Sequence, residues 1–263
     1  MAAGVRAVLC IAGVLFSASV AAFDHAHKAW DVLLRKHVVL LEGGKASRLD
    51  YAGMAQERGA LRAYLENLSR VSESEFSAWS KPEQVAFLVN AYNAFTAEKI
   101  LTRYPNLKSI WDFGRFFANP FGDEFFTLLG RRTSLDGIEH GILRKRYGEP
   151  RIHYAVNCAA VGCPMLREEA YVAVNLEKQL EEQARRFLSD RTRNRVRAGR
   201  LEVSKIFDWF REDFEPLEGY LARHAATLAD NAPDRDRIAA RALPVSFLDY
   251  DWSLNDSRSS SPR

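Results

Sequence analysis

The chain has few cysteines, little excess charge and no long apolar run beyond its first residues. Only three of its 263 residues are cysteine, and its formal net charge at pH 7 is +3. A charge so close to balance gives no reason to expect a nucleic acid partner. The hydrophobic fraction of 47% and the charged fraction of 27% are those of a soluble globular protein. Because the sequence also lacks an internal repeat and a linker-like stretch, we predict a single, mainly helical α+β domain with a small β-sheet.

Residues 1–22 have the pattern of a secretory signal peptide. Arg6 gives a positive start, residues 7–16 are mostly apolar, and small residues suited to cleavage follow. The apolar run is too short to span a membrane comfortably, so we expect no stable membrane insertion after cleavage. The predicted location is the periplasm or the exterior, with an uncleaved N-terminal anchor as the alternative. Cleavage would remove Cys10 and leave two cysteines in an oxidising compartment.

Those two cysteines lie close together in residues 151–166, RIHYAVNCAAVGCPML. The β-branched and aromatic content of residues 152–156 predicts a short buried strand. His153 lies within this strand, and Cys158 and Cys163 follow it. Whether these thiols react or form a structural disulfide is the main question that the sequence raises.

Apolar spacing and capping residues divide the rest of the chain into helices and short strands. Helices are predicted at 24–40, 51–68, 82–104, 134–147, 175–189, 206–214 and 217–226. Hairpins or strands are predicted at 125–133, 195–203 and 245–251. We expect residues 23–80 to form a helical segment packed on a core domain of residues 81–255, followed by a disordered polar tail at 256–263.

A cysteine nucleophile needs a base that removes its proton and donors that stabilise the oxyanion. Cys158 follows the predicted strand, whereas Cys163 precedes Pro164 and is placed to begin a helical turn, whose dipole would lower the pKa of its thiol. The sequence leaves open which of the two is the nucleophile. His153 is the nearest base, but five residues of extended strand span about 16 Å. The two side chains meet only if the chain turns sharply at Asn157.

His140 is the second candidate base, and Glu139 is its neighbour in a predicted helix. Consecutive helical side chains point about 100° apart, so Glu139 and His140 are not expected to face one point. Glu139 is better placed to orient a histidine from another segment, such as His153. Which histidine acts as the base is therefore open.

The long helix predicted at 82–104 carries Asn90 and Asn93 three residues apart, with Tyr92 between them. Asparagine is unfavourable inside helices because its side chain competes for backbone hydrogen bonds. The pair therefore predicts a buried polar network near a substrate-binding site. A solvated helix face without such a role fits the spacing equally well.

The cysteines have two further interpretations. In an exported protein, Cys158 and Cys163 can close a short structural disulfide loop. Together with His140 and His153 they also supply the ligand types of zinc, although their spacing matches no standard zinc pattern. Apart from that alternative, we expect no metal and no cofactor.

Five blocks of the sequence resemble the family called domain of unknown function 547, which occurs in bacterial exported proteins and in plant and animal proteins. The blocks are FLVNAYNAFTAEKI (87–100), SLDGIEHGILR (134–144), RIHYAVNCAAVGCPMLREEAY (151–171), SKIFDWFREDF (204–214) and FLDYDWSLN (247–255). They cover about residues 81–255, and the helices before them resemble those of bacterial members. The resemblance implies that residues at its motif positions form one site: Asn90, Asn93, Glu139, His140, His153, Cys158 and Cys163.

We therefore expect an exported thiol-dependent hydrolase or acyl transferase that acts on a small substrate with an amide or peptide-like bond. Cys158 is the predicted nucleophile, His153 the general base and Glu139 the acid that orients it. Contacts to the substrate or the oxyanion are expected from Asn90, Tyr92, Asn93 and Asn157. This combination is similar to papain-like and transglutaminase-like hydrolases with a rearranged order. The alternatives are a non-catalytic binding or scaffold domain with a structural disulfide, and a zinc-binding site.

Overall fold

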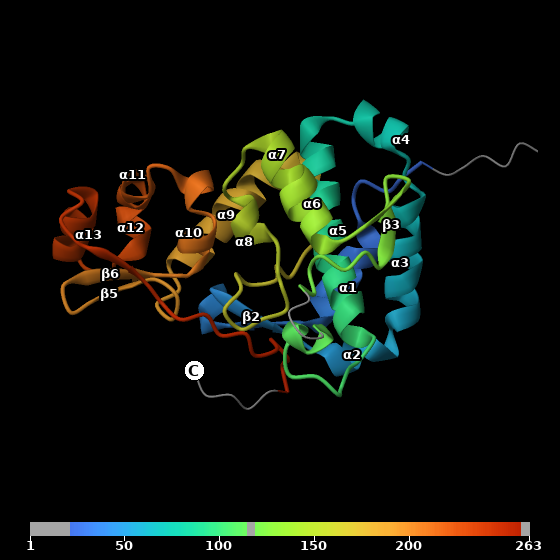
Figure 1. Ribbon diagram of the computed structural model, residues 1–263, viewed down its shortest axis with the longest axis horizontal. Coiled ribbons are helices and arrows are strands. Elements are labelled where there is room, and N and C mark those ends of the chain that lie inside the picture. Colours follow the sequence, from blue (N-terminus) through green and yellow to red (C-terminus); the bar gives the residue numbers. More distant parts are fainter. Residues whose placement is uncertain (1–21, 115–118, 259–263) are drawn as a thin grey trace, which may run out of the picture.

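The computed structural model describes residues 22–114 and 119–258. All but one residue of the predicted signal peptide lie outside this range, as do residues 259–263 of the predicted tail. The described residues form one α+β domain built mostly of helices (Figure 1). The predicted fold class is confirmed. A papain-like or transglutaminase-like core is not confirmed, and the sheets in this part of the chain have only two or three strands.

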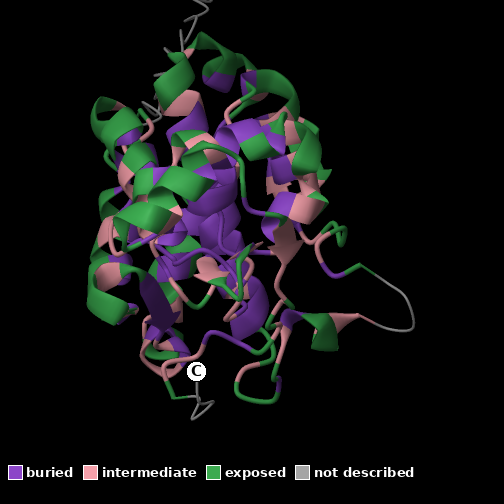
Figure 2. Cartoon of the chain, turned by 90° about the vertical axis from the view of Figure 1, so that its left-hand side faces the viewer, coloured by how far each residue is buried: buried purple, intermediate pink, exposed green. Residues whose placement is uncertain are grey.

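Helix α5, Lys81–Leu101, lies at the centre of the domain. Ser80 and Glu83 form a capping box at its start, in which the N–H of Ser80 donates to Glu83 Oε2 at 2.8 Å. Every side chain from Val85 to Ala97 is buried, and Figure 2 shows the buried residues gathered in the interior of the molecule. A helix covered on all sides can present polar groups inward wherever neighbouring segments supply partners for them.

The elements before α5 pack against it. They are α1 (Lys28–His37), β1 (Val38–Leu41), β2 (Ala46–Leu49), α2 (Tyr51–Gln56), α3 (Arg58–Arg70) and α4 (Glu73–Ala78). Trp30, Leu61 and Phe76 belong to the same hydrophobic cluster as Phe87 of α5. The helix predicted at 24–40 ends earlier than expected, because β1 pairs with β2 as an antiparallel hairpin.

The elements after residue 175 form the opposite end of the domain (Figure 1). They are α9 (Leu176–Leu188), β5 (Arg195–Arg197), β6 (Arg200–Val203), α10 (Ile206–Trp209), α11 (Leu217–Arg223), α12 (Ala225–Leu228), α13 (Ala232–Ala239) and β7 (Val245–Phe247). Strand β6 pairs antiparallel with β5 and parallel with β7. A second hydrophobic cluster fills this end, with Phe187, Phe207 and Phe214 fully buried in it.

The segment between α5 and α9 supplies most of the polar side chains discussed below. Its elements are β3 (Phe126–Leu128), β4 (Arg131–Thr133), α6 (Leu135–Ile138), a π-helical turn (Glu139–Leu143), α7 (Arg144–Tyr147) and α8 (Ile152–Ala155). Strands β3 and β4 form the predicted hairpin.

The strand predicted at 152–156 is wrong, because Ile152–Ala155 forms the short helix α8. The N–H of Val156 donates to the carbonyl of Ile152 at 3.1 Å. Ile152 is buried in the first cluster and Tyr154 in the second. Burial on opposite sides gives a continuous apolar run, and such a run does not distinguish a short helix from a strand.

The C-terminal segment returns from the second cluster to the first. The N–H of Gly162 donates to the carbonyl of Asp251 at 2.8 Å, and the N–H of Asn255 donates to that of Ala159 at 3.0 Å. These bonds hold the segment against the loop that carries both cysteines. The N–H of Ser257 in turn donates to the carbonyl of Leu49 in β2.

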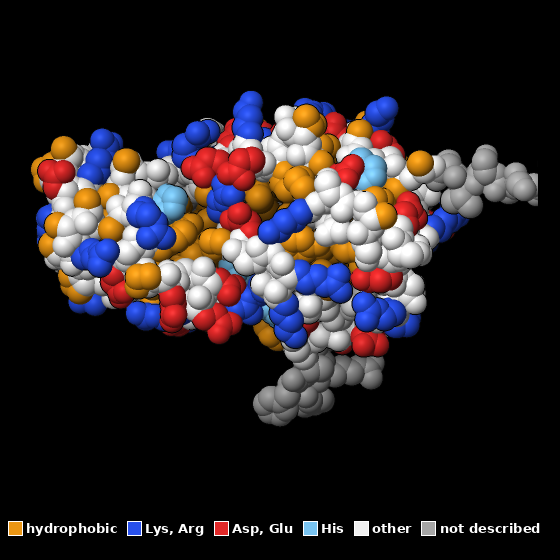
Figure 3. Space-filling view, turned by 90° about the horizontal axis from the view of Figure 1, so that it is seen from above, with side chains coloured by type: hydrophobic (Ala, Val, Ile, Leu, Met, Phe, Trp, Pro, Cys, Tyr) orange, Lys and Arg blue, Asp and Glu red, His pale blue; other side chains and the backbone are white. Residues whose placement is uncertain are grey.

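Charges of both signs are interspersed on the face shown in Figure 3, which accords with the nearly balanced composition. Among the helices of residues 22–114 and 119–258, none has the length and apolar character needed to cross a membrane.

Candidate functional site

A cavity of about 620 Å³ lies between α5, the turns around α6, α8 and the C-terminal segment. Both cysteines line it, together with the ionisable side chains Asp136, Glu139, His140 and His153. The fold thus brings acid, histidine and cysteine from separate segments to one place. A concave site of this size with a few convergent ionisable groups is the usual form of a small-molecule site.

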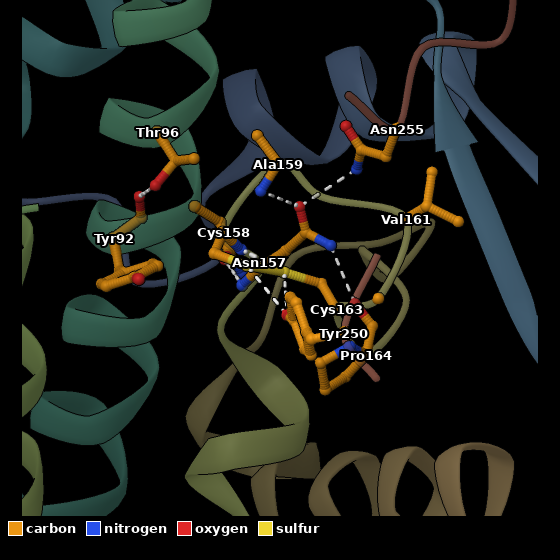
Figure 4. The surroundings of a disulfide bond; sticks show 12 residues. Tyr92, Thr96, Asn157, Cys158, Ala159, Val161, Cys163, Pro164, Tyr250 and Asn255 are labelled. Carbon is orange, nitrogen blue, oxygen red and sulfur yellow. Dashed lines mark hydrogen bonds between the residues drawn. A yellow bond between two sulfur atoms is a disulfide. The ribbon is translucent and has the colours of Figure 1, made fainter. Parts of the chain in front are cut away.

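Cys158 and Cys163 are joined by a disulfide, and their Cα atoms lie 6.1 Å apart (Figure 4). Cys163 is 2% exposed, whereas Cys158 is only partly buried. The N–H of Cys158 donates to the sulfur of Cys163 at 2.9 Å. In this oxidised state neither sulfur is a thiol, so the predicted nucleophile is available only after reduction.

Tyr250, from the C-terminal segment, covers the disulfide. Its hydroxyl oxygen lies 3.2 Å from the sulfur of Cys158 and 3.3 Å from that of Cys163. Gly162 permits this approach, because a Cβ atom at that position would lie only 3.0 Å from the ring of Tyr250. Burial raises the pKa of Tyr250, so the hydroxyl keeps its proton and can donate it in a hydrogen bond to either sulfur.

Asn157 holds the turn that leads into the cysteine loop. Its side-chain N–H donates to the carbonyl of Pro164 at 2.8 Å. Its side-chain oxygen accepts from the N–H of Ala159 at 3.0 Å and from the amide of Asn255 at 3.2 Å. The chain bends at Ala159, one residue after Cys158, and both polar groups of the Asn157 side chain hold the segment around this bend.

Asn90 and Asn93 are buried, so the solvated-face interpretation of this helix does not hold. Asn90 donates to the carbonyl of Tyr171 at 2.7 Å and accepts from the N–H of the same residue at 3.0 Å. Asn93 donates to the carbonyl of Ala155 and accepts from the N–H of Asn157. These amides fasten two loops to α5. Of the predicted substrate-binding residues, only Tyr92 lines the cavity.

Four charged side chains form a chain of contacts that starts at the cavity with the buried Glu139 and His153 and continues to the partly exposed Asp213 and Arg144. Nδ1 of His153 lies 3.5 Å from Glu139 Oε1, and its Nε2 lies 2.6 Å from Asp213 Oδ2. Arg144 donates to the same carboxylate of Asp213 through Nε at 2.6 Å and Nη2 at 3.1 Å. The ring of Phe210 stacks on His153 with centroids 4.1 Å apart. The contact between Glu139 and His153 was anticipated from the sequence, while Asp213 and Arg144 were not.

The pairing in this chain sets the protonation state of His153. Burial disfavours its charged form, but the hydrogen bonds to Asp213 and Glu139 outweigh burial and raise the pKa of His153. Burial likewise opposes the charge on the two carboxylates, yet hydrogen bonding to His153 lowers the pKa of Glu139, and His153 with Arg144 lowers that of Asp213. The pairing therefore favours the imidazolium form of His153, whose two N–H groups would both face carboxylates.

His140 has different surroundings in the same cavity. Its side chain is 40% exposed, and its Nε2 lies 3.6 Å from Asp136 Oδ1. Asp136 also accepts from the side-chain N–H of Asn119 at 2.6 Å, and burial raises the pKa of Asp136. The π-helical turn is wider than an α-turn, and both Glu139 and His140 line the cavity, contrary to the expectation from regular helical geometry.

Sequence reasoning missed most of the aromatic wall of the cavity, its acid Asp136, and Asp213 beside His153. Besides Tyr92, the aromatic lining consists of Trp111, Phe121, Trp209, Phe210, Tyr250 and Trp252. Several of these residues, with Asp136, Arg144 and Asp213, lie inside the motif blocks quoted for the family resemblance. Their position in those blocks was the available signal, since aromatic residues on their own are typical of a core.

The described residues contain no group of three or more His, Cys, Asp or Glu side chains arranged to hold a metal ion. The two sulfurs are bonded to each other, so in this state neither is a thiolate ligand. The zinc alternative gains no support from this arrangement.

Comparison with known proteins gives a family match and nothing further. No curated protein and no solved structure matches the chain. A family model does match residues 76–188, a segment that includes α5, α8 and both cysteines. Asp213 and Tyr250 lie beyond it. Residues 76–188 thus match the family described as "Protein of unknown function, DUF547", which confirms the resemblance drawn from the motifs.

Proposed function

We propose that the chain is a thiol-dependent hydrolase or acyl transferase acting on an amide or peptide-like bond, and that reduction of the Cys158–Cys163 disulfide releases its nucleophile. One observation carries the proposal. The two sulfurs and the histidine and acid side chains line a single cavity large enough for a small substrate. Reduction by an external dithiol would give two protein thiols and oxidise that dithiol to its disulfide.

Cys158 is the proposed nucleophile because it is the more exposed of the two cysteines. Its thiolate would attack the carbonyl carbon, the amine would leave, and a thioester on Cys158 would remain. Water then hydrolyses the thioester, or an acceptor amine takes the acyl group. The hydroxyl of Tyr250, within 3.2 Å of this sulfur, is placed to donate a hydrogen bond to the thiolate.

His140 is the proposed proton carrier, in place of the His153 expected from the sequence. Both nitrogens of His153 face carboxylates, at 2.6 Å from Asp213 and 3.5 Å from Glu139, and its side chain is 1% exposed. His140 is 40% exposed and lines the cavity, and its contacts are longer: its Nε2 lies 3.6 Å from Asp136 and its Nδ1 lies 3.4 Å from Nη1 of Arg144. A proton can therefore reach His140 with less disruption of existing pairs. The fixed charge of His153 would instead favour a thiolate nearby, and Glu139 would hold that charge in place.

An export location fits this proposal. An oxidising compartment would keep the chain in the disulfide form, and activity would then depend on a supply of reducing thiols. The predicted signal peptide is the motivation for this location.

Alkylation of the reduced protein tests the nucleophile. After reduction by dithiothreitol and its removal under nitrogen, we expect iodoacetamide to label Cys158 faster than Cys163, as mapped by peptide mass spectrometry. The variant Cys163→Ser, which leaves Cys158 free, should keep this fast labelling, and Cys158→Ser should lose it. If neither cysteine reacts in reduced protein that is still folded by circular dichroism, the nucleophile is misassigned.

The second candidate is a non-catalytic binding domain, which the bonded sulfurs and the buried loop around Asn157 favour. In that case the disulfide would persist in millimolar dithiothreitol in the folded protein. The reduced chain would also release no amine from acyl-amide substrates. Intact mass before and after reduction, measured beside the amine assay, separates the two candidates.

A further inference from the structure

We propose that the cavity binds an organic cation, with the ammonium group of a small molecule held against its aromatic rings and carboxylates. This inference deepens the proposed function by naming the class of substrate for the same cavity. It concerns binding alone and does not depend on whether the cysteines react.

Aromatic rings form one continuous wall of the cavity. Trp252 lies at its centre, with ring centroids 5.3 Å from Trp111, 6.2 Å from Phe121, 5.6 Å from Trp209 and 4.6 Å from Tyr250. The rings meet at different angles, from nearly stacked to edge-on, so they surround a volume and do not form a flat stack. Electron-rich faces arranged in this way bind ammonium groups through cation–π contacts.

Two of these rings are exposed where burial would be expected. Trp111 is 42% exposed and Trp209 is 43% exposed, although both line the cavity. Large exposed aromatic side chains gathered at a concave site indicate a surface that is covered when a ligand binds. Trp111 comes from the turn after α5, and Trp209 from α10, so the two ends of the domain each contribute one.

The charges around the cavity select for a cation. Asp136 and Glu139 line it, and none of the described lining residues is Lys or Arg. Arg144 contacts two lining residues, with its Nη1 3.4 Å from Nδ1 of His140 and its guanidinium 5.1 Å from the ring centroid of Phe210, and its charge is paired with both Asp213 and Glu212. The positive charge of His153 is likewise placed between two carboxylates.

Asp136 is the carboxylate that such a ligand would meet. Its partners are the neutral amide of Asn119 and the ring of His140, so no Lys or Arg neutralises it among the pairs within the described chain. A neutral sugar or a plain aromatic ligand would use the rings but would leave this half-buried carboxylate without a counter-charge. Charge complementarity therefore favours an ammonium compound over either of these.

A matched pair of ligands tests the inference on the full chain in its disulfide form. Choline carries a trimethylammonium group, and 3,3-dimethylbutan-1-ol has the same shape without the charge. Isothermal titration should show choline binding at least about tenfold more tightly than the alcohol. Equal affinity for the two, or displacement of choline by a neutral disaccharide at similar concentration, would overturn the proposal.

Variants place the binding site within the cavity. Asp136→Asn and Trp209→Leu should each weaken choline binding about tenfold or more. The matched controls are Asp230→Asn, which alters an exposed acid elsewhere, and Val174→Ala, which removes an exposed apolar group, and both should leave the affinity unchanged. Thermal unfolding verifies that each variant is folded. Unchanged binding in a folded Asp136→Asn variant would contradict the inference.

The outcome of this binding assay is independent of the outcome of the test for a cysteine nucleophile. If the oxidised chain binds choline but its thiols are unreactive after reduction, the cation site is supported and the hydrolase proposal is contradicted. If Cys158 is reactive but the chain binds choline no more tightly than its neutral analogue, the hydrolase proposal is supported and the cation site is contradicted.

Discussion

His153 and His140 line the same cavity, yet the two imidazoles differ in burial and in pairing. The side chain of His153 is 1% exposed and lies between Glu139 and Asp213, while that of His140 is 40% exposed beside Asp136. Removal from water favours the neutral form of a histidine, and close carboxylates favour the charged form. At His153 the two carboxylates prevail over burial and raise its pKa, so its charged form is favoured. Burial alone would have lowered that pKa.

The difference in burial and pairing assigns different roles to the two histidines: His153 supplies a fixed charge, and His140 is the proposed base. A histidine with both nitrogens occupied orders its neighbours and supplies a fixed field, and it cannot shuttle a proton without breaking a buried pair. His140 is partly exposed, and its nitrogens make longer contacts, 3.6 Å to Asp136 and 3.4 Å to Arg144. The predictions below test this division, beginning with the largest expected effect.

Replacing His153 should destabilise the fold far more than replacing His140. His153→Gln removes the charge between Glu139 and Asp213 and leaves Glu139 buried without its partner, which should lower the free energy of unfolding by about 3 kcal/mol. The control, His140→Gln, should cost less than about 0.5 kcal/mol, since that side chain is well exposed. Urea denaturation of both variants measures the contrast, and equal losses would remove the distinction between them.

A smaller loss is expected from the acid on the far side of His153. Asp213→Asn keeps the shape of the side chain but removes the charge that pairs with His153 and Arg144. Because Asp213 is 24% exposed, solvent compensates in part, and we expect a loss of about 2 kcal/mol. Asp136→Asn is the matched control and should cost less than about 1 kcal/mol. A larger loss from the control would mean that Asp136, and not Asp213, holds the site together.

The reactivity of the thiol should depend on the other histidine. In reduced protein, His140→Gln should slow iodoacetamide labelling of Cys158 about tenfold near neutral pH, because the proposed base is gone. His140→Ala with added imidazole should recover part of the rate, an effect that a purely structural role would not produce. If the labelling rate of Cys158 is unchanged in the folded His140→Gln variant, His140 is not the base.

Local patterns in the sequence predicted the parts of this site that depend on neighbouring residues. The capping box of Ser80 and Glu83 marked the start of α5, and its physical cause lies within the first turn of that helix. The pairing of Glu139 with His153 was also anticipated, although the π-helical turn lets both Glu139 and His140 line the cavity, against the regular helical angle used in the argument.

The rest depends on contacts between distant segments. Asp213 lies 60 residues from His153 and 69 from Arg144, and no local pattern links these three side chains. The helix α8 was mistaken for a strand because its residues are buried in two different clusters. The role assigned to His153 changed for the same reason, since the second carboxylate that occupies its Nε2 comes from the other end of the domain.

The smallest expected effect that tests the pairing of His153 is the pH dependence of stability. The ordinary pKa of histidine is 6.5 and that of His153 is raised, so its stabilising contribution is complete below pH 6.5 and is lost as the pH rises through the raised value. The pKa of Glu139 is lowered from 4.5, so its contribution is complete above pH 4.5 and is lost as the pH falls through the lowered value. The difference in unfolding free energy between the wild type and His153→Gln should therefore be largest between pH 4.5 and 6.5. It should shrink at higher pH, where the folded wild type releases the proton of His153. A difference for His153→Gln that instead grows with rising pH would show that the buried histidine is neutral.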